Sequence, residues 1–205
     1  ELPAKIMVFG TPAEEGGGGK VIMCEKGVFD GVDAALLCHP HAHTYVQRNA
    51  ISCVDVNFKF YGKSAHASGA PEKGISALDA IINSFVAINS LRQFFKDGTR
   101  VHGIILKGGD APNVVPDYTE ARFILRAPNI EELKIVKEKV YAAVHHSAEA
   151  VGATHKIVEG LVYAERTANP TMAKLCKENY ELMGVEVSPP PKRGGMGSSD
   201  MGNVG

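Results

Sequence analysis

The sequence predicts an α/β fold in which a parallel-sheet domain is interrupted by an inserted ferredoxin-like βαββαβ domain. Residues 5–40 show the order strand, turn, helix, strand, which is typical of a parallel sheet covered by helices. Residues 51–163 show the order β-α-β-β-α-β of a split-βαβ unit. After residue 163, the pattern of the parallel-sheet domain returns. The predicted boundaries are 1–47 and 162–205 for the interrupted domain and 48–161 for the inserted one.

The first part of the interrupted domain has two apolar runs. Residues 5–10 are too short and too apolar to alternate, which predicts a buried strand. From Lys20 onward, apolar residues at helical spacing predict a short helix. Residues 33–40, "DAALLCHP", predict a second strand. Ligands of parallel sheets bind at the carboxyl ends of the strands. The polar residues at these ends, Glu14, Glu15 and His39, are therefore candidates for a site.

The inserted domain begins with residues 51–62, which alternate apolar and polar side chains as a half-exposed strand does. Its second helix, over 129–152, has the clearest signals, because Asn129 can cap it and Gly152 stops it. The other predicted elements are a helix over 75–95, strands within 100–109 and 113–127, a strand over 154–163, a helix over 169–185 with Pro170 in its first turn, and a loop over 188–205.

The composition excludes several classes of protein. The 205 residues are 44% apolar and 22% charged, as in an ordinary globular protein. A net charge of -1 gives no footprint for nucleic acid or an acidic membrane surface, and no apolar run approaches the roughly 20 residues that a membrane span needs. Four widely spaced cysteines favour small buried thiols over disulfides. We therefore expect a cytoplasmic protein with no nucleic-acid or membrane partner.

The stretch "KIMVFGTPAEEGGGGK" combines two adjacent carboxylates with four glycines. A phosphate loop is excluded, because the Walker pattern aligned on Lys20 needs glycine where Glu14 stands, and the dinucleotide pattern GxGxxG also fails. The glycines then supply backbone freedom and close approach before a helix. Two interpretations of Glu14 and Glu15 remain open. They are a solvated helix N-terminus, or a pair in which one carboxylate binds a metal and the other takes a proton from the water that the metal activates.

The stretch "CHPHAHT" contributes a possible imidazole ligand at the end of the second strand. For His39 alone, a metal ligand and a core histidine are equally open interpretations. His41 and His43 lie beyond Pro40, where we expect them to face solvent or to stand behind the ligands.

Five motifs occur in the order and spacing of the di-metal amidohydrolases, a family of metallopeptidases: "GTPAEEGGGGK", "HP" at 39–40, "GKSAHASGAPEKGISALDA", "GGDAPNVVPDYTEARFILRA" and "GMGSSDMGNV". The sequence resembles this family over essentially its whole length, and most closely its aminobenzoyl-glutamate hydrolase and β-alanyl-lysine dipeptidase-like branch. The resemblance implies metal-dependent hydrolysis of the amide bond of an N-acyl or N-aroyl amino acid or a dipeptide. It also implies two divalent metal ions, zinc or manganese, and a homodimer formed through the inserted lid domain.

The resemblance implies a role for eight residues. Glu14 matches the general base, and Glu15 and His39 match metal ligands. His66 matches a lid histidine that reaches into the partner subunit's site and steadies the oxyanion. The positions that match substrate contacts are Asn113, Arg126, Gly197 and Ser198. Judged from the residues alone, Arg126 is open between a carboxylate-binding residue and a surface strand residue, and Asp200 could simply cap the next helix.

The sequence departs from the family in its ligand set. The family's site also needs a histidine or cysteine motif with an aspartate upstream and a histidine downstream of the "GSSD" loop, and this sequence holds neither. We therefore expect an incomplete fragment that binds metal poorly by itself and is inactive. The alternative function is a non-catalytic binding or assembly module built around the lid domain. RNA binding by the βαββαβ unit is a minor alternative, because the unit lacks a basic face and an aromatic-rich RNP1 strand.

Overall fold

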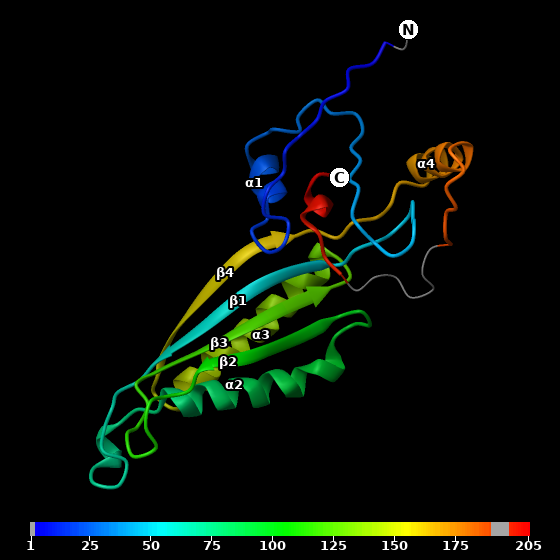
Figure 1. Ribbon diagram of the computed structural model, residues 1–205. Helices are drawn as coiled ribbons and strands as arrows, with labels where there is room; N and C mark the ends of the chain where they lie inside the picture. Colours follow the sequence, from blue (N-terminus) through cyan, green and yellow to red (C-terminus); the bar gives the residue numbers. More distant parts are fainter. Residues whose placement is uncertain (1–2, 190–196) are drawn as a thin grey trace.

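The computed structural model describes residues 3–189 and 197–205, and an antiparallel four-stranded sheet in the order β2-β3-β1-β4 forms its centre (Figure 1). Two helices cover one face of this sheet. The elements are α1 (Gly19–Glu25), β1 (Ser52–Tyr61), α2 (Ala77–Leu91), β2 (Arg100–Lys107), β3 (Tyr118–Ala127), α3 (Ile130–Ala150), β4 (Thr154–Tyr163) and α4 (Pro170–Leu182), with short 3₁₀ helices η1 (Pro71–Lys73), η2 (Arg92–Phe94) and η3 (Asp200–Asn203).

The βαββαβ order predicted for residues 51–163 is confirmed, and its helix ends form as the sequence predicts. The Asn129 side chain accepts a hydrogen bond from the backbone N–H of Glu132 at 2.9 Å, which caps α3. Gly152 has φ +74°, the left-handed conformation that ends a helix. Pro170 opens α4, as predicted, after the Asn169 cap. The unit therefore follows from alternation and capping signals in its own sequence.

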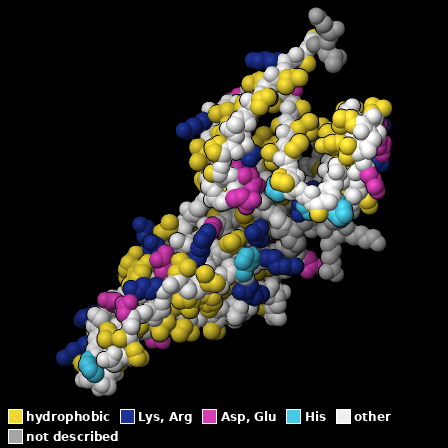
Figure 2. Space-filling model, viewed as in Figure 1, with side chains coloured by type: hydrophobic (Ala, Val, Ile, Leu, Met, Phe, Trp, Pro, Cys, Tyr) yellow, Lys and Arg dark blue, Asp and Glu magenta, His cyan; other side chains and the backbone are white. Residues whose placement is uncertain are grey.

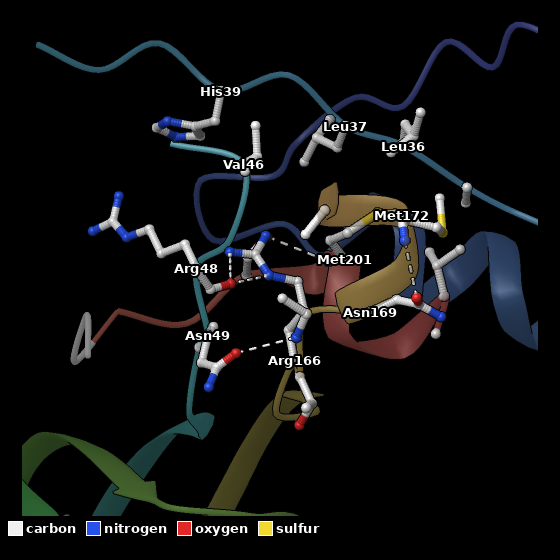
Figure 3. A pocket seen from close by; sticks show the side chains of 18 of the residues that line it. Leu36, Leu37, His39, Val46, Arg48, Asn49, Arg166, Asn169, Met172 and Met201 are labelled. Atoms are coloured by element: carbon white, nitrogen blue, oxygen red, sulfur yellow. Dashed lines mark hydrogen bonds between the residues drawn. The ribbon is translucent and has the colours of Figure 1, made fainter. Parts of the chain in front are cut away.

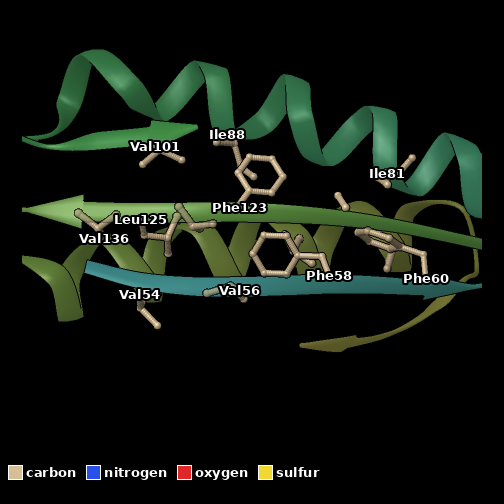
Figure 4. Packing of buried hydrophobic residues seen from close by; sticks show 14 of the residues in the cluster. Val54, Val56, Phe58, Phe60, Ile81, Ile88, Val101, Phe123, Leu125 and Val136 are labelled. Atoms are coloured by element: carbon tan, nitrogen blue, oxygen red, sulfur yellow. The ribbon is translucent and has the colours of Figure 1, made fainter. Parts of the chain in front are cut away.

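The core lies between the sheet and helices α2 and α3 (Figure 4). Alternate residues of β1, among them Val56 and Phe58, point toward the helices and are buried, as are alternate residues of β3. Phe123 of β3 stands between aromatic neighbours, with ring centroids 5.4 Å from Phe58 and 4.7 Å from Phe85. The opposite face of the sheet carries charged side chains of both signs, such as the paired Asp55 and Arg122 (Figure 2).

The two strands predicted for the interrupted domain are wrong. Residues 5–10 and 33–40 form no strand, and Ile6 and Val8 are 91% and 94% exposed. A strand needs a neighbour to satisfy its backbone N–H and C=O groups. Within the described part of the chain, the four strands of the sheet pair with one another, and no further segment pairs with either run. The parallel sheet predicted for this domain is therefore absent from the described residues.

Three smaller expectations have mixed outcomes. The short helix expected from Lys20 is confirmed as α1. Residues 190–196 of the predicted glycine-rich loop lie outside the described residues. The expected burial of the cysteines is wrong, because Cys38 is exposed and the other three are only partly buried. Among the described residues, no helix combines the length and apolar character needed to cross a membrane.

Candidate functional site

The glycine-rich loop holds Glu14 in a defined backbone position. Ala13 has φ +60° and is the one non-glycine residue with a positive φ among those described. This conformation costs a non-glycine residue about 1–2 kcal/mol, and such strain is common at functional sites. The Tyr163 hydroxyl, at the end of β4, donates to the Glu14 carbonyl oxygen at 3.1 Å. The loop is thereby tied to the edge of the central sheet.

Two of the four glycines are required by the geometry. Gly18 has φ +56° and packs against Leu161 and Tyr163 of β4. At Gly19, an added Cβ would lie 1.9 Å from the carbonyl oxygen of Pro12. These positions supply the backbone freedom and the close approach that the sequence predicts, and α1 begins at Gly19.

The structure brings Glu14, Glu15 and His39 together. One ligand atom from each lies within 4.8 Å of the other two, and Glu14 is half-buried while the other two are exposed. The Nδ1 of His39 lies 2.9 Å from the carbonyl oxygen of Pro40. A carbonyl oxygen can only accept, so Nδ1 carries the hydrogen in this contact and Nε2 keeps its lone pair. Two carboxylates and one imidazole are a donor set that suits zinc or manganese, so these residues fit a divalent metal ion.

A cavity of about 830 Å³ opens beside this cluster, between residues 29–50, α4 and η3. Figure 3 shows His39, Arg48 and Arg166 among the side chains around it. Acidic side chains gather at the hollow between the α1 and α4 parts of the molecule (Figure 2). The predicted site residues that line the cavity are Glu14, Glu15, His39, Gly197 and Ser198. The exposed His41 and His43 line it too.

Arg126 reaches the same region from the end of β3. Its Nη1 donates to the Ser198 hydroxyl at 2.9 Å. The Gly197 carbonyl oxygen accepts from the backbone N–H of Ile51 at 3.0 Å, just before β1. The "GSSD" loop is therefore joined to the ends of two neighbouring strands of the central sheet, and two residues predicted to contact substrate touch each other.

The predicted role of Asp200 as a helix cap is wrong. Ser199 caps η3, whereas the buried Asp200 forms an ion pair with Lys20, with Nζ and Oδ1 2.9 Å apart. The backbone N–H of Lys20 also donates to Oδ2 at 3.0 Å. This pair links the helix that follows Glu14 and Glu15 to the loop that carries Ser198. The sequence did not indicate this pair, because Lys20 and Asp200 are 180 residues apart in the chain.

Arg166 is another residue at this site that the sequence did not indicate. It lines the cavity, and its Nε and Nη2 donate to the Arg48 carbonyl oxygen at 3.2 and 3.0 Å. Burial lowers the pKa of Arg166, the neighbouring Arg48 lowers it further, and Glu14 raises it. An arginine pKa starts so high that the guanidinium stays charged near neutral pH. The cavity thus presents a fixed cation near the acidic pair, which suits a substrate carboxylate.

His66 and Asn113 are not brought to this cluster within one chain. Their loops pair with each other, since the backbone N–H of Ala67 donates to the Asn113 carbonyl oxygen at 3.0 Å. Both loops lie at the end of the sheet away from α1 (Figure 1). The Nδ1 of His66 accepts from the backbone N–H groups of Ser68 and Gly69 at 3.3 and 3.1 Å. The hydrogen of the neutral ring is therefore on Nε2, and His66 is an exposed donor.

Sequence comparison finds relatives along the whole chain. The profile of the M20 peptidase dimerisation domain matches residues 48–151. The Xaa-Arg dipeptidase of Mus musculus is 37% identical over 98% of this chain and 48% of its own length. One of the subunits of the p-aminobenzoyl-glutamate hydrolase of Escherichia coli is 36% identical over 66% of this chain and 28% of its own length. The chain thus spans about half the length of the dipeptidase.

Solved structures share the fold. The aminobenzoyl-glutamate utilization protein from Klebsiella pneumoniae superposes with a TM-score of 0.79 at 22% identity, over 95% of this chain and 51% of that one. The aminopeptidase PepT from Bacillus cereus gives a TM-score of 0.71 at 21% identity, with the same coverage. At these identities the likeness establishes the fold alone.

Proposed function

This chain belongs to the M20 family of peptidases and amidohydrolases, and we propose that its protein hydrolyses the amide bond of an N-acyl or N-aroyl amino acid or a dipeptide. The observation that carries the proposal is the convergence of Glu14, Glu15 and His39 beside a substrate-sized cavity. The first two are neighbours in the sequence, but His39 comes from a separate segment. Apposition of like charges is unfavourable unless a cation or a proton compensates it.

The cluster is the proposed metal centre, with Glu15 and His39 as ligands. Two divalent ions, zinc or manganese, are the cofactors that we propose. An ion held there supplies Lewis-acid polarisation of the scissile carbonyl and lowers the pKa of the attacking water. The Nδ1–H contact of His39 with Pro40 supports the ligand role, because it directs the Nε2 lone pair outward.

Glu14 is the proposed general base. Its carboxylate stands in the same cluster as Glu15, while its backbone is held by the Tyr163 hydroxyl. A base held in this way can take the proton of the attacking water and deliver it to the leaving amine. Arg126, joined to Ser198 of the "GSSD" loop, and Arg166, on the cavity wall, offer cations for the substrate's carboxylate.

His66 and Asn113 are proposed to act on the site of a second copy of the chain. Their loops lie at the far end of the sheet from the Glu14 cluster, so one chain does not complete the site with them (Figure 1). The exposed Nε2–H of His66 suits the stabilisation of a developing oxyanion. A homodimer formed through the inserted lid domain would bring such a donor to the partner's cavity.

We place the dimer contact at the β2 edge and the adjoining face of α2. β2 is an edge strand, which leaves one row of backbone groups without a strand partner. Ile104 and Leu106 are exposed on β2, and Ile82 and Val86 form an exposed apolar stripe on α2, which lies along β2 (Figure 1). An edge and apolar side chains together suit pairing with an identical edge.

Charges at this surface should separate the subunits. We expect the double variant Ile104→Asp/Val86→Asp to run as a monomer in light scattering at concentrations where the unchanged protein is a dimer, because two carboxylates would be buried unpaired at the contact. Val158→Asp, an exposed position on the opposite edge strand β4, is the matched control and should remain a dimer. If both variants form dimers with the same affinity, the contact lies elsewhere.

Metal removal tests the hydrolase proposal against the binding or assembly module. The intact protein is treated with a chelator and assayed on dipeptides ending in arginine or lysine, on p-aminobenzoyl-glutamate and on N-acyl amino acids. We expect hydrolysis to be lost on chelation and restored by zinc or manganese. Less than one metal ion per chain, with no hydrolysis across the panel, would instead support the module.

A further inference from the structure

A second group of metal-binding side chains lies on the inserted domain. The described residues contain two groups whose ligand atoms all lie within 4.8 Å of one another, the cavity cluster and His145, His146 and Glu149. The second group occupies the last two turns of α3. His145 and Glu149 are four residues apart, so their side chains share one helix face. The spacing that brings them together is therefore part of a rigid helix.

The two distances between a histidine nitrogen and Glu149 are close to those between ligands of a tetrahedral ion. The Nε2 of His145 lies 3.2 Å from Glu149 Oε1, and the Nδ1 of His146 lies 3.2 Å from Glu149 Oε2. Ligands about 2.0–2.1 Å from a tetrahedral zinc ion are separated from each other by about 3.3 Å. Each histidine nitrogen thus lies at a ligand-like distance from one oxygen of Glu149.

The local electrostatics favour a cation at this place. Glu149 stands in the last turn of α3, where the helix dipole is negative, and that turn holds no basic residue. A carboxylate here is unfavourable unless positive charge compensates it. The imidazole rings of His145 and His146 each offer a nitrogen lone pair to a metal.

His155, near the start of β4, adds a fourth side chain. Its ring centroid lies 5.3 Å from that of His145. Because His155 belongs to a strand, an ion that it shares with His145 would join α3 to β4.

We propose that His145, His146 and Glu149, completed by His155, bind a divalent first-row transition metal, with zinc as the representative ion. Imidazole and carboxylate donors suit zinc, copper and nickel. The site is separate from the cavity cluster, because His155 and Tyr163, whose hydroxyl contacts Glu14, lie at opposite ends of β4, about 27 Å apart at 3.3–3.4 Å per residue. The ion would fasten the end of α3 to the edge strand.

The test is zinc binding to the intact protein in a background that carries Glu15→Ala and His39→Ala, which removes the two proposed ligands of the cavity cluster. Isothermal titration with zinc alone, after chelator treatment, should show one equivalent bound. His145→Ala/His155→Ala should abolish it, and Glu149→Gln should weaken it at least about tenfold, since even outer-shell changes cost 10–100-fold. His102→Ala, an exposed histidine on β2, is the matched control and should bind as the background does.

Two further readouts separate a metal site from a change in folding. Cobalt in place of zinc should give the visible absorption of a tetrahedral complex in the background and not in His145→Ala/His155→Ala. Zinc should raise the melting temperature of the background but not that of His145→Ala/His155→Ala. After chelation, the two proteins should have the same melting temperature. Equal zinc affinity and stoichiometry in the background and the histidine variant would overturn the proposal.

Discussion

Replacing Glu14 by glutamine is expected to lower hydrolysis by about 10²–10⁴-fold, the contribution of a positioned general base. Glutamine keeps the size and the hydrogen-bonding capacity of the side chain but takes up no proton. The Tyr163 contact is made to the backbone carbonyl of residue 14, so it survives the change. Glu15 and His39 remain, so the metal content measured by elemental analysis should be unchanged. Steady-state kinetics on the best substrate of the panel measures the loss.

Glu25→Gln is the control for this experiment. Glu25 is exposed at the end of α1, so the same chemical change should leave kcat/KM within a factor of about two. Wild-type activity in Glu14→Gln would show that another group accepts the proton. Loss of the metal together with the activity would show that Glu14 is a ligand and would reverse the proposed roles of the two carboxylates.

The βαββαβ unit could be predicted from sequence because its signals are local. Alternation along residues 52–61 identifies the face of β1 that is buried, and the cap at Asn129 marks where α3 begins. Each of these features depends on residues within a few positions of one another. The sheet then brings the elements into the order that a βαββαβ unit requires.

The strands expected at 5–10 and 33–40 could not be settled by such local signals. An apolar run shows that a segment can be buried, but a strand forms only if another strand satisfies its backbone. Among the described residues no such neighbour exists for either run. Glu14, Glu15 and His39 nevertheless meet, held by loop contacts such as that between Tyr163 and Glu14 rather than by the strand ends on which the prediction relied.

The Lys20–Asp200 pair could not be predicted because its partners are 180 residues apart in the chain. The glycines before Lys20 raised the possibility of a phosphate-binding loop, and the position of Asp200 suggested a helix cap. Neither charge faces solvent, because the Asp200 side chain is fully buried and the Lys20 side chain is nearly so. Burying such an ion pair costs desolvation free energy. In return, the pair favours one arrangement of the segments that carry it. Here the neighbours are the loops that carry Glu14 and Ser198.

Replacing Lys20 by methionine is expected to lower the free energy of unfolding by about 3–5 kcal/mol, measured by urea denaturation. Among the described residues, the change leaves the buried Asp200 carboxylate with the backbone N–H of residue 20 as its remaining hydrogen-bond donor. Lys26→Met, at an exposed position just after α1, is the matched control and should stay within about 0.5 kcal/mol of the parent. An equal loss of unfolding free energy in both variants would show that the effect comes from introducing methionine and not from breaking the ion pair.

The double variant Lys20→Met/Asp200→Leu decides what the pair does. With both charges removed, the desolvation cost disappears, so we expect more than half of the lost stability to return. If the pair serves only stability, activity should return with it. If the pair holds the two loops in register, both Lys20→Met and the double variant should show a raised KM for the substrate. The double variant would then regain stability without regaining KM, because leucine and methionine pack together without the direction of a hydrogen bond. Restored stability and restored KM together would reduce Lys20 and Asp200 to a structural role.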